Sequence, residues 1–227
     1  LAICQDVGGI LPELLRLEGW KIHEIGLARH ILSPSWHNRA WQIAKDFKPD
    51  VIHGAVIEGV ALANGIGMRC PSVPVISEET SDPVNRSWKG NLLMRAMCMR
   101  SNVAIGVSPA VGEYLRSTAK LPERKVRVIN NAVSSAPAVS DDEIAKQRSN
   151  FGFSPDEFII GSVGRIVNDP KRFSDLILAV KILHDNGFKN VKLIIIGDGP
   201  DRVNLERLVQ ECSLNDHVVF AGYHGEA

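Results

Sequence analysis

The sequence has no excess of charge, few cysteines and no long apolar run. Lysine plus arginine and aspartate plus glutamate number 26 each among 227 residues. A strongly basic surface, which nucleic-acid-binding proteins usually carry, is therefore not expected, and no nucleic acid is predicted as a partner. Nowhere does the chain offer the roughly 18 consecutive apolar residues of a membrane-spanning helix. Its 44% apolar and 23% charged content is instead typical of a globular protein.

The four cysteines are scattered and form no C-x-x-C pair. This pattern is typical of free thiols in a reducing compartment and, without a secretion signal, predicts a cytoplasmic protein. The seven histidines form no cluster, and His23-Glu24 lacks the second histidine of a zinc-binding helix, so no metal site is predicted. Because the chain begins with Leu1 rather than methionine, we expect a fragment of a longer protein.

Short apolar runs alternate with helical patterns, which predicts an α/β fold with parallel sheets. In the first half, strands are predicted near 50–53, 73–77, 103–107 and 126–129, and helices near 89–100 and 109–117. In the second half, strands are predicted at 158–163, 191–196 and 217–220, with two amphipathic helices between them. Residues 134–150, which begin small and polar, form the predicted linker between domains at 1–133 and 151–227.

Two basic residues follow the strand predicted at 158–163. Arg165 comes directly after Gly164, and Lys171 lies six residues beyond Arg165. In open parallel sheets, ligands bind beyond the carboxyl ends of the strands, where both side chains would project. Arginine offers a planar bidentate fork and lysine a point charge, a pairing that suits a diphosphate. The alternative is that both are solvated loop residues, and the spacing alone does not decide between the two.

Two other strand-to-helix turns are similar to motifs of other enzyme classes. Gly106-Val107-Ser108-Pro109-Ala110 is similar to the nucleophile elbow of serine hydrolases. Pro109, however, has no N–H for an oxyanion hole, and a helix cap explains Ser108 better. Gly197-Asp198-Gly199-Pro200 stands where a dinucleotide fingerprint would, but Arg202 occupies the third glycine position. Both alternative classes are therefore disfavoured.

Other polar candidates lie at turns and strand ends. Gly8-Gly9 is either a structural turn or a close approach of backbone to a ligand. Glu78-Glu79 follows the strand predicted at 73–77, and adjacent residues of an extended chain point to opposite sides, so at most one faces a cleft. His53 ends another predicted strand and is either a core histidine or a cleft residue.

The order of these segments resembles glycosyltransferase family 4, the large family of retaining, nucleotide-sugar-dependent enzymes with the GT-B fold. The most specific part runs from Ile160-Gly161-Ser162-Val163-Gly164-Arg165 through Lys171, and it continues with Gly197-Asp198-Gly199-Pro200 and Phe220-Ala221-Gly222. Upstream, the segments 48–53, 74–76, 106–108 and 128–133 are similar to the N-terminal domain of that family.

This resemblance implies two Rossmann-like domains with a cleft between them, and specific roles for several residues. Gly164, Arg165 and Lys171 would hold the donor diphosphate, with Arg165 and Lys171 as the catalytic cations. Gly222 and Tyr223 would lie near the nucleobase. Gly8 and Gly9 would lie near the reacting centre. The donor would be a nucleotide diphosphate sugar, no cofactor or metal would be needed, and the acceptor would be a sugar, a lipid or another hydroxyl compound. The resemblance also allows peripheral contact with a membrane.

The sequence departs from the family pattern in three places. The segment from Gly9 to the next strand is shorter than is usual in the family. Relatives commonly carry a histidine a few residues after the strand predicted at 73–77; here the position is Thr80, and Glu79 is a candidate to take its role on the acceptor side. The two glutamates that contact donor sugar and ribose in the family lie downstream of the Gly222 position, beyond Ala227. We therefore expect an incomplete second domain and an inactive isolated chain. A non-catalytic nucleotide- or glycan-binding module remains the alternative.

Overall fold

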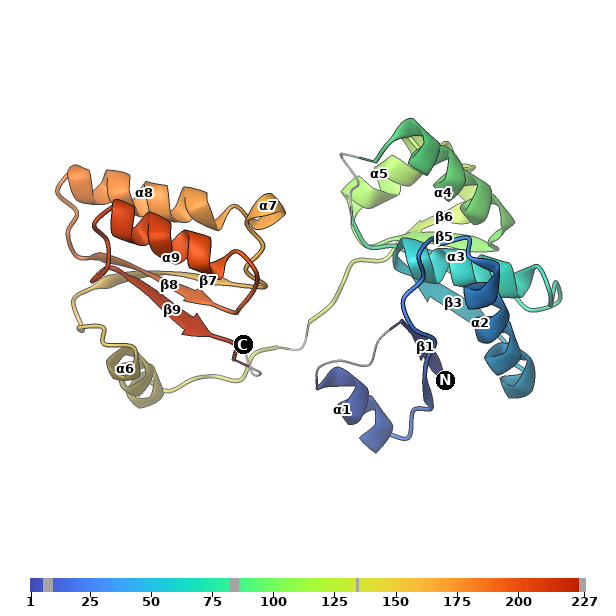
Figure 1. Cartoon of the computed structure of the whole chain (residues 1–227), viewed down its shortest axis with the longest axis horizontal. Coiled ribbons are helices and arrows are strands. Elements are labelled where there is room, and N and C mark those ends of the chain that lie inside the picture. The colour runs from blue at the N-terminus through green and yellow to red at the C-terminus, as the bar shows by residue number, and fades with distance from the viewer. Residues whose placement is uncertain (6–9, 82–85, 134, 225–227) are drawn as a thin grey trace. The chain divides into compact units, whose positions relative to one another are not determined.

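A computed structural model describes residues 1–5, 10–81, 86–133 and 135–224, and its chain divides into two compact units, Leu1–Ser134 and Ser135–Ala227 (Figure 1). The elements of the first unit are β1 (Ala2–Cys4), α1 (Leu11–Leu17), β2 (Ile22–Glu24), α2 (Pro34–Phe47), β3 (Ile52–Ala55), α3 (Val56–Gly67), β4 (Val75–Glu79), α4 (Trp88–Arg100), β5 (Val103–Gly106), α5 (Pro109–Ser117), a 3-10 turn (Glu123–Lys125) and β6 (Val126–Val128). Strands β3-β4-β5-β6 form one parallel sheet, and β1-β2 a separate parallel pair.

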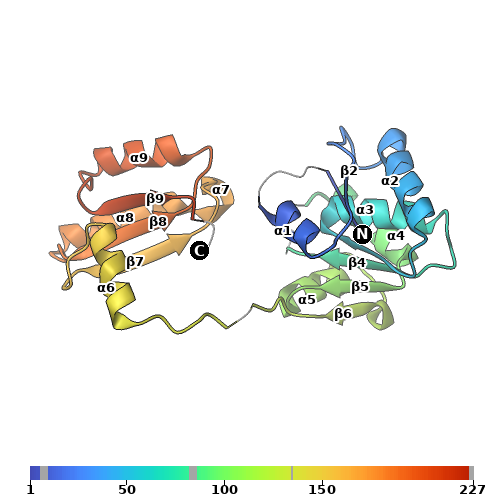
Figure 2. The same cartoon turned by 90° about the horizontal axis from the view of Figure 1, so that it is seen from below.

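One face of the four-stranded sheet carries the core of the first unit. Ile52, Val75, Ala104 and Val126 are buried, one from each strand, and they pack with residues of α2 to α5. Figure 2 shows α3 and α4 above the strands. Side chains alternate along a strand, so His53, Ile76, Glu78 and Ile105 belong to the other face, where they are exposed or half-buried.

Local sequence sets the start of α5 as predicted. The Ser108 hydroxyl accepts a hydrogen bond from the Val111 N–H at 3.3 Å, and Pro109 opens the helix. An N-cap hydroxyl satisfies one of the donors that a helix start leaves free, and proline needs no N–H there. Ser108 is therefore a helix cap in this structure.

The second unit contains α6 (Asp141–Asn150), β7 (Phe158–Val163), α7 (Asn168–Lys171), α8 (Phe173–Asp185), β8 (Val191–Ile196), α9 (Arg202–Glu211) and β9 (Val218–Gly222). The strands form a parallel sheet in the order β7-β8-β9, and β7 and β8 have the predicted bounds. Helices α8 and α9 cover one face (Figure 1), where Phe173, Ile177, Leu193, Ile195 and Leu205 are buried together.

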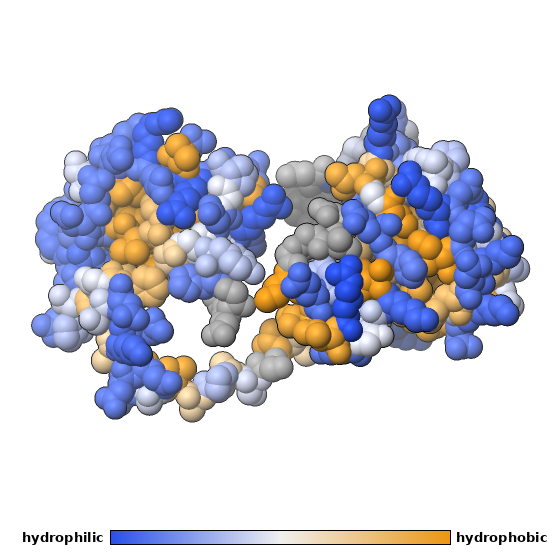
Figure 3. Space-filling model, turned by 60° about the horizontal axis from the view of Figure 1, so that its bottom comes forward, coloured by the Kyte–Doolittle hydropathy of each residue, from blue (hydrophilic) through white to orange (hydrophobic). Residues whose placement is uncertain are grey.

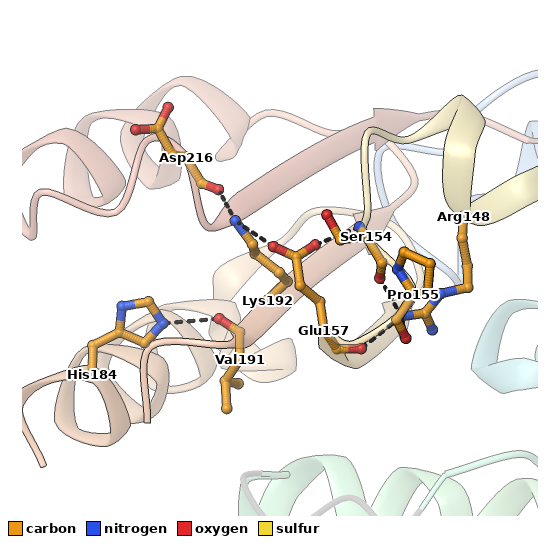
Figure 4. Close-up of polar contacts among 8 residues, drawn as sticks. All are labelled: Arg148, Ser154, Pro155, Glu157, His184, Val191, Lys192 and Asp216. Carbon is orange, nitrogen blue, oxygen red and sulfur yellow. Dashed lines mark hydrogen bonds and ion pairs between the residues drawn. The ribbon is translucent and has the colours of Figure 1, made fainter. Parts of the chain in front are cut away.

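The predicted linker contains helix α6. Its Ser140 and Glu143 form a capping box, in which the Ser140 hydroxyl accepts from the Glu143 N–H and the Glu143 carboxylate accepts from the Ser140 N–H. Arg148 then ties the helix to the start of β7, because its guanidinium donates to the carbonyl oxygens of Ser154, Pro155 and Glu157 at 2.8, 3.1 and 2.6 Å (Figure 4).

The amino edge of the second sheet is held by polar side chains that bond to one another and to backbone carbonyl oxygens. Lys192 forms an ion pair with Glu157 at 3.1 Å and donates to the Asp216 carbonyl at 2.6 Å (Figure 4). His184 Nε2 lies 2.8 Å from the Val191 carbonyl oxygen. This edge is therefore structural, and the opposite edge is the one left for ligands.

Both units leave apolar side chains exposed. On the side shown in Figure 3, apolar side chains are open to the viewer in each unit. Phe158 and Val163 at the two ends of β7 are 65% and 60% exposed. None of the helices in the described part of the chain combines the length and the apolar character that a membrane span requires.

Candidate active site

A pocket of about 480 Å³ lies at the carboxyl ends of β7, β8 and β9. Its lining residues are Val163, Gly164, Arg165, Ile196, Gly197, Asp198, Tyr223 and His224. The register explains the grouping: Val163 pairs with Ile196, and Ile196 pairs with Gly222, so the three strands end at the same level. This is the edge of a parallel α/β sheet at which ligands bind.

A bulge brings β9 to that level. Ile195 pairs with Phe220 but the next residue, Ile196, pairs with Gly222, so β9 holds one extra residue. Gly222 adopts φ 77°, a conformation that glycine reaches without steric cost, and its carbonyl accepts from the Gly197 N–H at 2.7 Å. Gly222, which the sequence predicts near the nucleotide-sugar donor, thus sets the direction in which the chain leaves β9 toward Tyr223.

The loops after β7 and β8 lie directly against each other. Gly164 N donates to Ile196 O and Ile166 N to Asp198 O, each at 2.9 Å. A Cβ on Gly197 would collide with the Gly164 carbonyl oxygen, and one on Gly199 with that of Ile166. Glycine is therefore needed at 197 and 199 because the backbone that carries Arg165 passes close to both residues. This packing requirement differs from the role of glycines in a dinucleotide-binding motif.

Arg165 lines the pocket with an exposed side chain. Within the described part of the chain, its guanidinium makes no hydrogen bond or ion pair. Lys171 ends α7 and is also exposed, but it is not among the pocket-lining residues. The loop between them is anchored by Asn168, whose N–H donates to Asp201 at 2.8 Å and whose side-chain oxygen accepts from Ser174 N at 2.9 Å.

Asp198 contributes a carboxylate to the pocket, but local donors engage it. It accepts from the Gly199 N–H at 2.7 Å and lies 3.8 Å from Arg202. Arg202 also pairs with Glu206 at 2.7 Å and lies 5.8 Å from the centre of the Phe220 ring. The hydrogen bond to Glu206 is the main cause that raises the pKa of Arg202. Arg165 thus differs from Arg202 in having no carboxylate partner among the described residues.

The acceptor-side candidate Glu79 is buried in the first unit. It is 4% exposed, and its carboxylate accepts from Arg86 at 2.7 Å. Arg86 also donates to the Tyr114 hydroxyl at 2.9 Å, and Tyr114 donates to Asn91 at 2.9 Å. Burial raises the pKa of Tyr114, against the opposing effect of Arg86. Thr80, the next residue, is exposed.

Burial raises the pKa of the Cys98 thiol to about 12, and the Glu79 carboxylate adds to this shift. Glu78 points to the other face of the sheet and pairs with His53 at 3.1 Å across β3 and β4. Gly8 and Gly9 lie outside the described residues. Among the residues that are described, no group of three potential metal ligands occurs.

Sequence reasoning missed Asp198 and His224 as pocket residues. Residues one or two positions past aligned parallel strands gather at one edge, so knowledge of where the three strands end relative to one another would have identified both residues. Predicting that alignment requires the register and the bulge in β9, which strand periodicity does not specify.

Two family profiles match the chain. One described as "Glycosyltransferase Family 4" matches residues 4–136, and one described as "Glycosyl transferases group 1" matches residues 143–227. Among curated relatives, the lipopolysaccharide core biosynthesis glycosyltransferase LpsD of Rhizobium meliloti is 35% identical over 46% of this chain and 27% of its own length. The alpha-monoglucosyldiacylglycerol synthase of Streptococcus pneumoniae is 26% identical over 82% of this chain and 44% of its own length.

Solved structures give the same fold. Anabaena Alr3699/HepE in complex with UDP and glucose superimposes with a TM-score of 0.81 at 16% identity, over 99% of this chain and 61% of that chain. Its complex with UDP-glucose also gives 0.81, at 19% identity over 97% and 60%. The chain therefore has the expected GT-B-like fold and spans less than half of the curated relatives named above. It belongs to glycosyltransferase family 4.

Proposed function

We propose that the protein to which this chain belongs transfers a sugar from a nucleotide diphosphate donor to a hydroxyl acceptor, with retention of the anomeric configuration. The observation that carries the proposal is Arg165, which lies in a pocket at the carboxyl edge of a parallel sheet and has no charged partner among the described residues. The second unit would hold the donor, and the first unit would supply the acceptor side.

The chemistry of the leaving group gives Arg165 its role. When the bond between sugar and diphosphate breaks, negative charge grows on the diphosphate oxygens. A cation already placed there stabilises the transition state more than the ground state. Arg165 can offer two parallel N–H donors to such oxygens, and Lys171, which follows the same strand, would add a point charge.

Tyr223 and His224 would face the nucleobase. Both line the pocket, and Tyr223 is 73% exposed, so its ring is free to stack on a planar ligand. The printed names of the relatives favour UDP as the first nucleotide to test for binding, UDP-glucose as the first donor, and sugar or lipid hydroxyls as the first acceptors. Neither a metal nor another cofactor is part of the proposal.

Titration of UDP into the 227-residue chain tests the donor site. Loss of a charge-assisted hydrogen bond in Arg165→Ala should weaken binding by about 1.5 to 3 kcal/mol, or roughly 10- to 150-fold. Arg207→Ala is the matched control, because Arg207 is an exposed arginine of α9 outside the pocket. Equal affinity of wild type and Arg165→Ala would refute the site.

A transfer assay separates the enzyme from the alternative, a non-catalytic nucleotide- or glycan-binding module. The full-length protein should transfer sugar from a labelled donor and retain activity in excess chelator, since protein cations neutralise the leaving group. UDP binding without transfer to any acceptor would favour the binding module. Activity that chelator abolishes and magnesium restores would overturn the metal-free mechanism.

A further inference from the structure

His53 and Glu78 form a pair on the exposed face of the first sheet, close to its carboxyl edge. The register places Ala55 of β3 opposite Glu78 of β4, and His53 shares a face with Ala55 because the two are two residues apart. His53 Nε2 lies 3.1 Å from a carboxylate oxygen of Glu78. The His53 side chain is 49% exposed, so it is not a core histidine, which is one of the two roles that the sequence allows.

The carboxylate of Glu78 determines which nitrogen of the neutral His53 ring carries the proton. An ionised carboxylate only accepts hydrogen bonds, so Nε2 donates to Glu78 and Nδ1 keeps its lone pair. Within the described part of the chain, Nδ1 makes no hydrogen bond. A histidine held in one tautomer by a carboxylate is well prepared to accept a proton from an O–H group.

His53 also lines a cavity of about 580 Å³ along β3. This volume is within the range of small-molecule sites. Trp20, Phe47 and Leu62 contribute apolar side chains to the lining, and Asp50 is another polar member. The cavity gives a ligand room beside the imidazole, and its lining suits an acceptor that carries apolar surface next to its hydroxyl.

The backbone at the end of β3 is strained. Val56, the residue that follows the strand, has φ 61°, which is rare for a β-branched residue. The turn is also tight, because a Cβ on Gly54 would collide with the carbonyl oxygen of Gly59. Strained residues persist where the surrounding structure holds them, and they cluster at ligand and active sites. The strain at Val56 is therefore an independent indication of a site at the end of the strand that carries His53.

We propose that His53 binds the hydroxyl of the acceptor and takes up its proton during sugar transfer, with Glu78 as the residue that positions it. This proposal rests on the proposed transfer function and adds the chemistry of the acceptor side. As the acceptor oxygen bonds to the anomeric carbon of the donor sugar, its O–H bond breaks and the proton moves to Nδ1 of His53. The bond between sugar and diphosphate breaks in the same reaction, and its electron pair leaves with the diphosphate.

The charged groups around His53 set the expected effect of pH. Glu78 comes from β4, Asp50 from the segment before β3, and Glu58 from the first turn of α3. Leu1 adds its terminal amine to the lining of the cavity, and α2 contributes apolar side chains. Nearby carboxylates favour the protonated ring, which has no lone pair left for an acceptor hydroxyl. Transfer should therefore slow as the pH falls.

A pH–rate profile of the full-length protein tests the proposal, with UDP-glucose as the donor and octyl glucoside as the acceptor. The kcat/KM of the wild type should fall on the acid side. His53→Gln can accept a hydrogen bond but cannot take up a proton, so its kcat should drop by roughly 100-fold or more and the acid limb should disappear. In Glu78→Gln the acid limb should move to lower pH, because the carboxylate no longer favours the protonated ring.

Two exposed residues of the first unit outside the cavity provide matched controls. His30→Gln and Glu113→Gln should keep the rate and the pH profile of the wild type. Every variant should bind UDP as the wild type does, because the donor belongs to the second unit. Nitrogen-15 NMR of the imidazole rings gives a second readout on the 227-residue chain: the neutral ring of His53 should carry its proton on Nε2, and Glu78→Gln should show a mixture of tautomers.

The outcomes separate this proposal from the proposed function. A rate and an acid limb in His53→Gln equal to those of the wild type would overturn the role of His53 and leave sugar transfer intact. A neutral His53 ring protonated on Nδ1 would also overturn it. Transfer to other acceptors but not to octyl glucoside would refute the acceptor class that the cavity indicates. A full-length protein that binds UDP but transfers glucose to no acceptor would overturn both proposals.

Discussion

The carboxyl edges of the two parallel sheets differ in whether the charged side chains of the candidate site are paired. In the first unit, Glu79 is paired with Arg86, and Glu78 with His53. In the second unit, the backbone loops bond to each other, and Arg165 has no partner among the described side chains. A buried charge that is already paired binds a ligand only by giving up its partner, which is costly, whereas a cation in a pocket without a protein partner can bind an anionic ligand directly.

The largest effect is expected when the buried pair of the first unit is broken. Glu79→Gln would leave Arg86, whose side chain is only 14% exposed, without its counter-charge. Removing one partner of a buried pair costs about 3 to 5 kcal/mol, so the denaturant midpoint of the first unit should fall sharply. Glu78→Gln is the control, because its partner His53 is 49% exposed and the loss should stay below about 1 kcal/mol. Equal losses would contradict the distinction between the two pairs.

A smaller effect is expected when Gly197 is replaced, because the loops after β7 and β8 lie against each other at this residue. Gly197→Ala would drive a methyl group into the Gly164 carbonyl oxygen at a backbone φ of 133°. Overpacking of this kind costs about 1 to 3 kcal/mol, and the pocket should lose affinity for UDP as Arg165 is displaced. Gly187→Ala is the matched control, since its φ is 94° but open space surrounds it. A thermal melt of both variants measures the loss of stability, and a UDP titration measures the loss of affinity.

These expectations show how far the sequence alone predicts the molecule. The bounds of β7 and β8 follow from apolar runs flanked by turns, and α5 follows from Ser108-Pro109, because both depend on neighbouring residues. The three-residue strands β1 and β2 give no such signal and were not predicted. Arg165 is recognisable from its place after a strand. The burial of Glu79 is not, because it depends on Arg86 and Tyr114, which reach it only in the folded unit.

The stability of the second unit should depend on pH through His217, which directly precedes β9 at the amino edge of the sheet. Burial, followed by the neighbouring His184, lowers the pKa of His217 in the folded state from its usual 6.5. The unfolded chain therefore binds a proton first as the pH falls, and the second unit should lose stability below about pH 6.5. Urea unfolding of wild type and His217→Phe across this range measures the slope. An unchanged slope in His217→Phe would assign the pH dependence to other groups.

The smallest effect is expected for the His53–Glu78 pair. Its atoms lie 3.1 Å apart, but the side chains are 49% and 22% exposed, and the pair carries opposite charges only when the imidazole is protonated. A double-mutant cycle with His53→Ala and Glu78→Gln should give a coupling of about 0.2 to 1 kcal/mol. A weak coupling would mean that an acceptor hydroxyl can compete for either side chain at little cost to stability. A coupling as large as the loss in Glu79→Gln would instead make the whole carboxyl edge of the first unit structural, and acceptor binding would then have to rely on other groups, such as the exposed hydroxyl of Thr80.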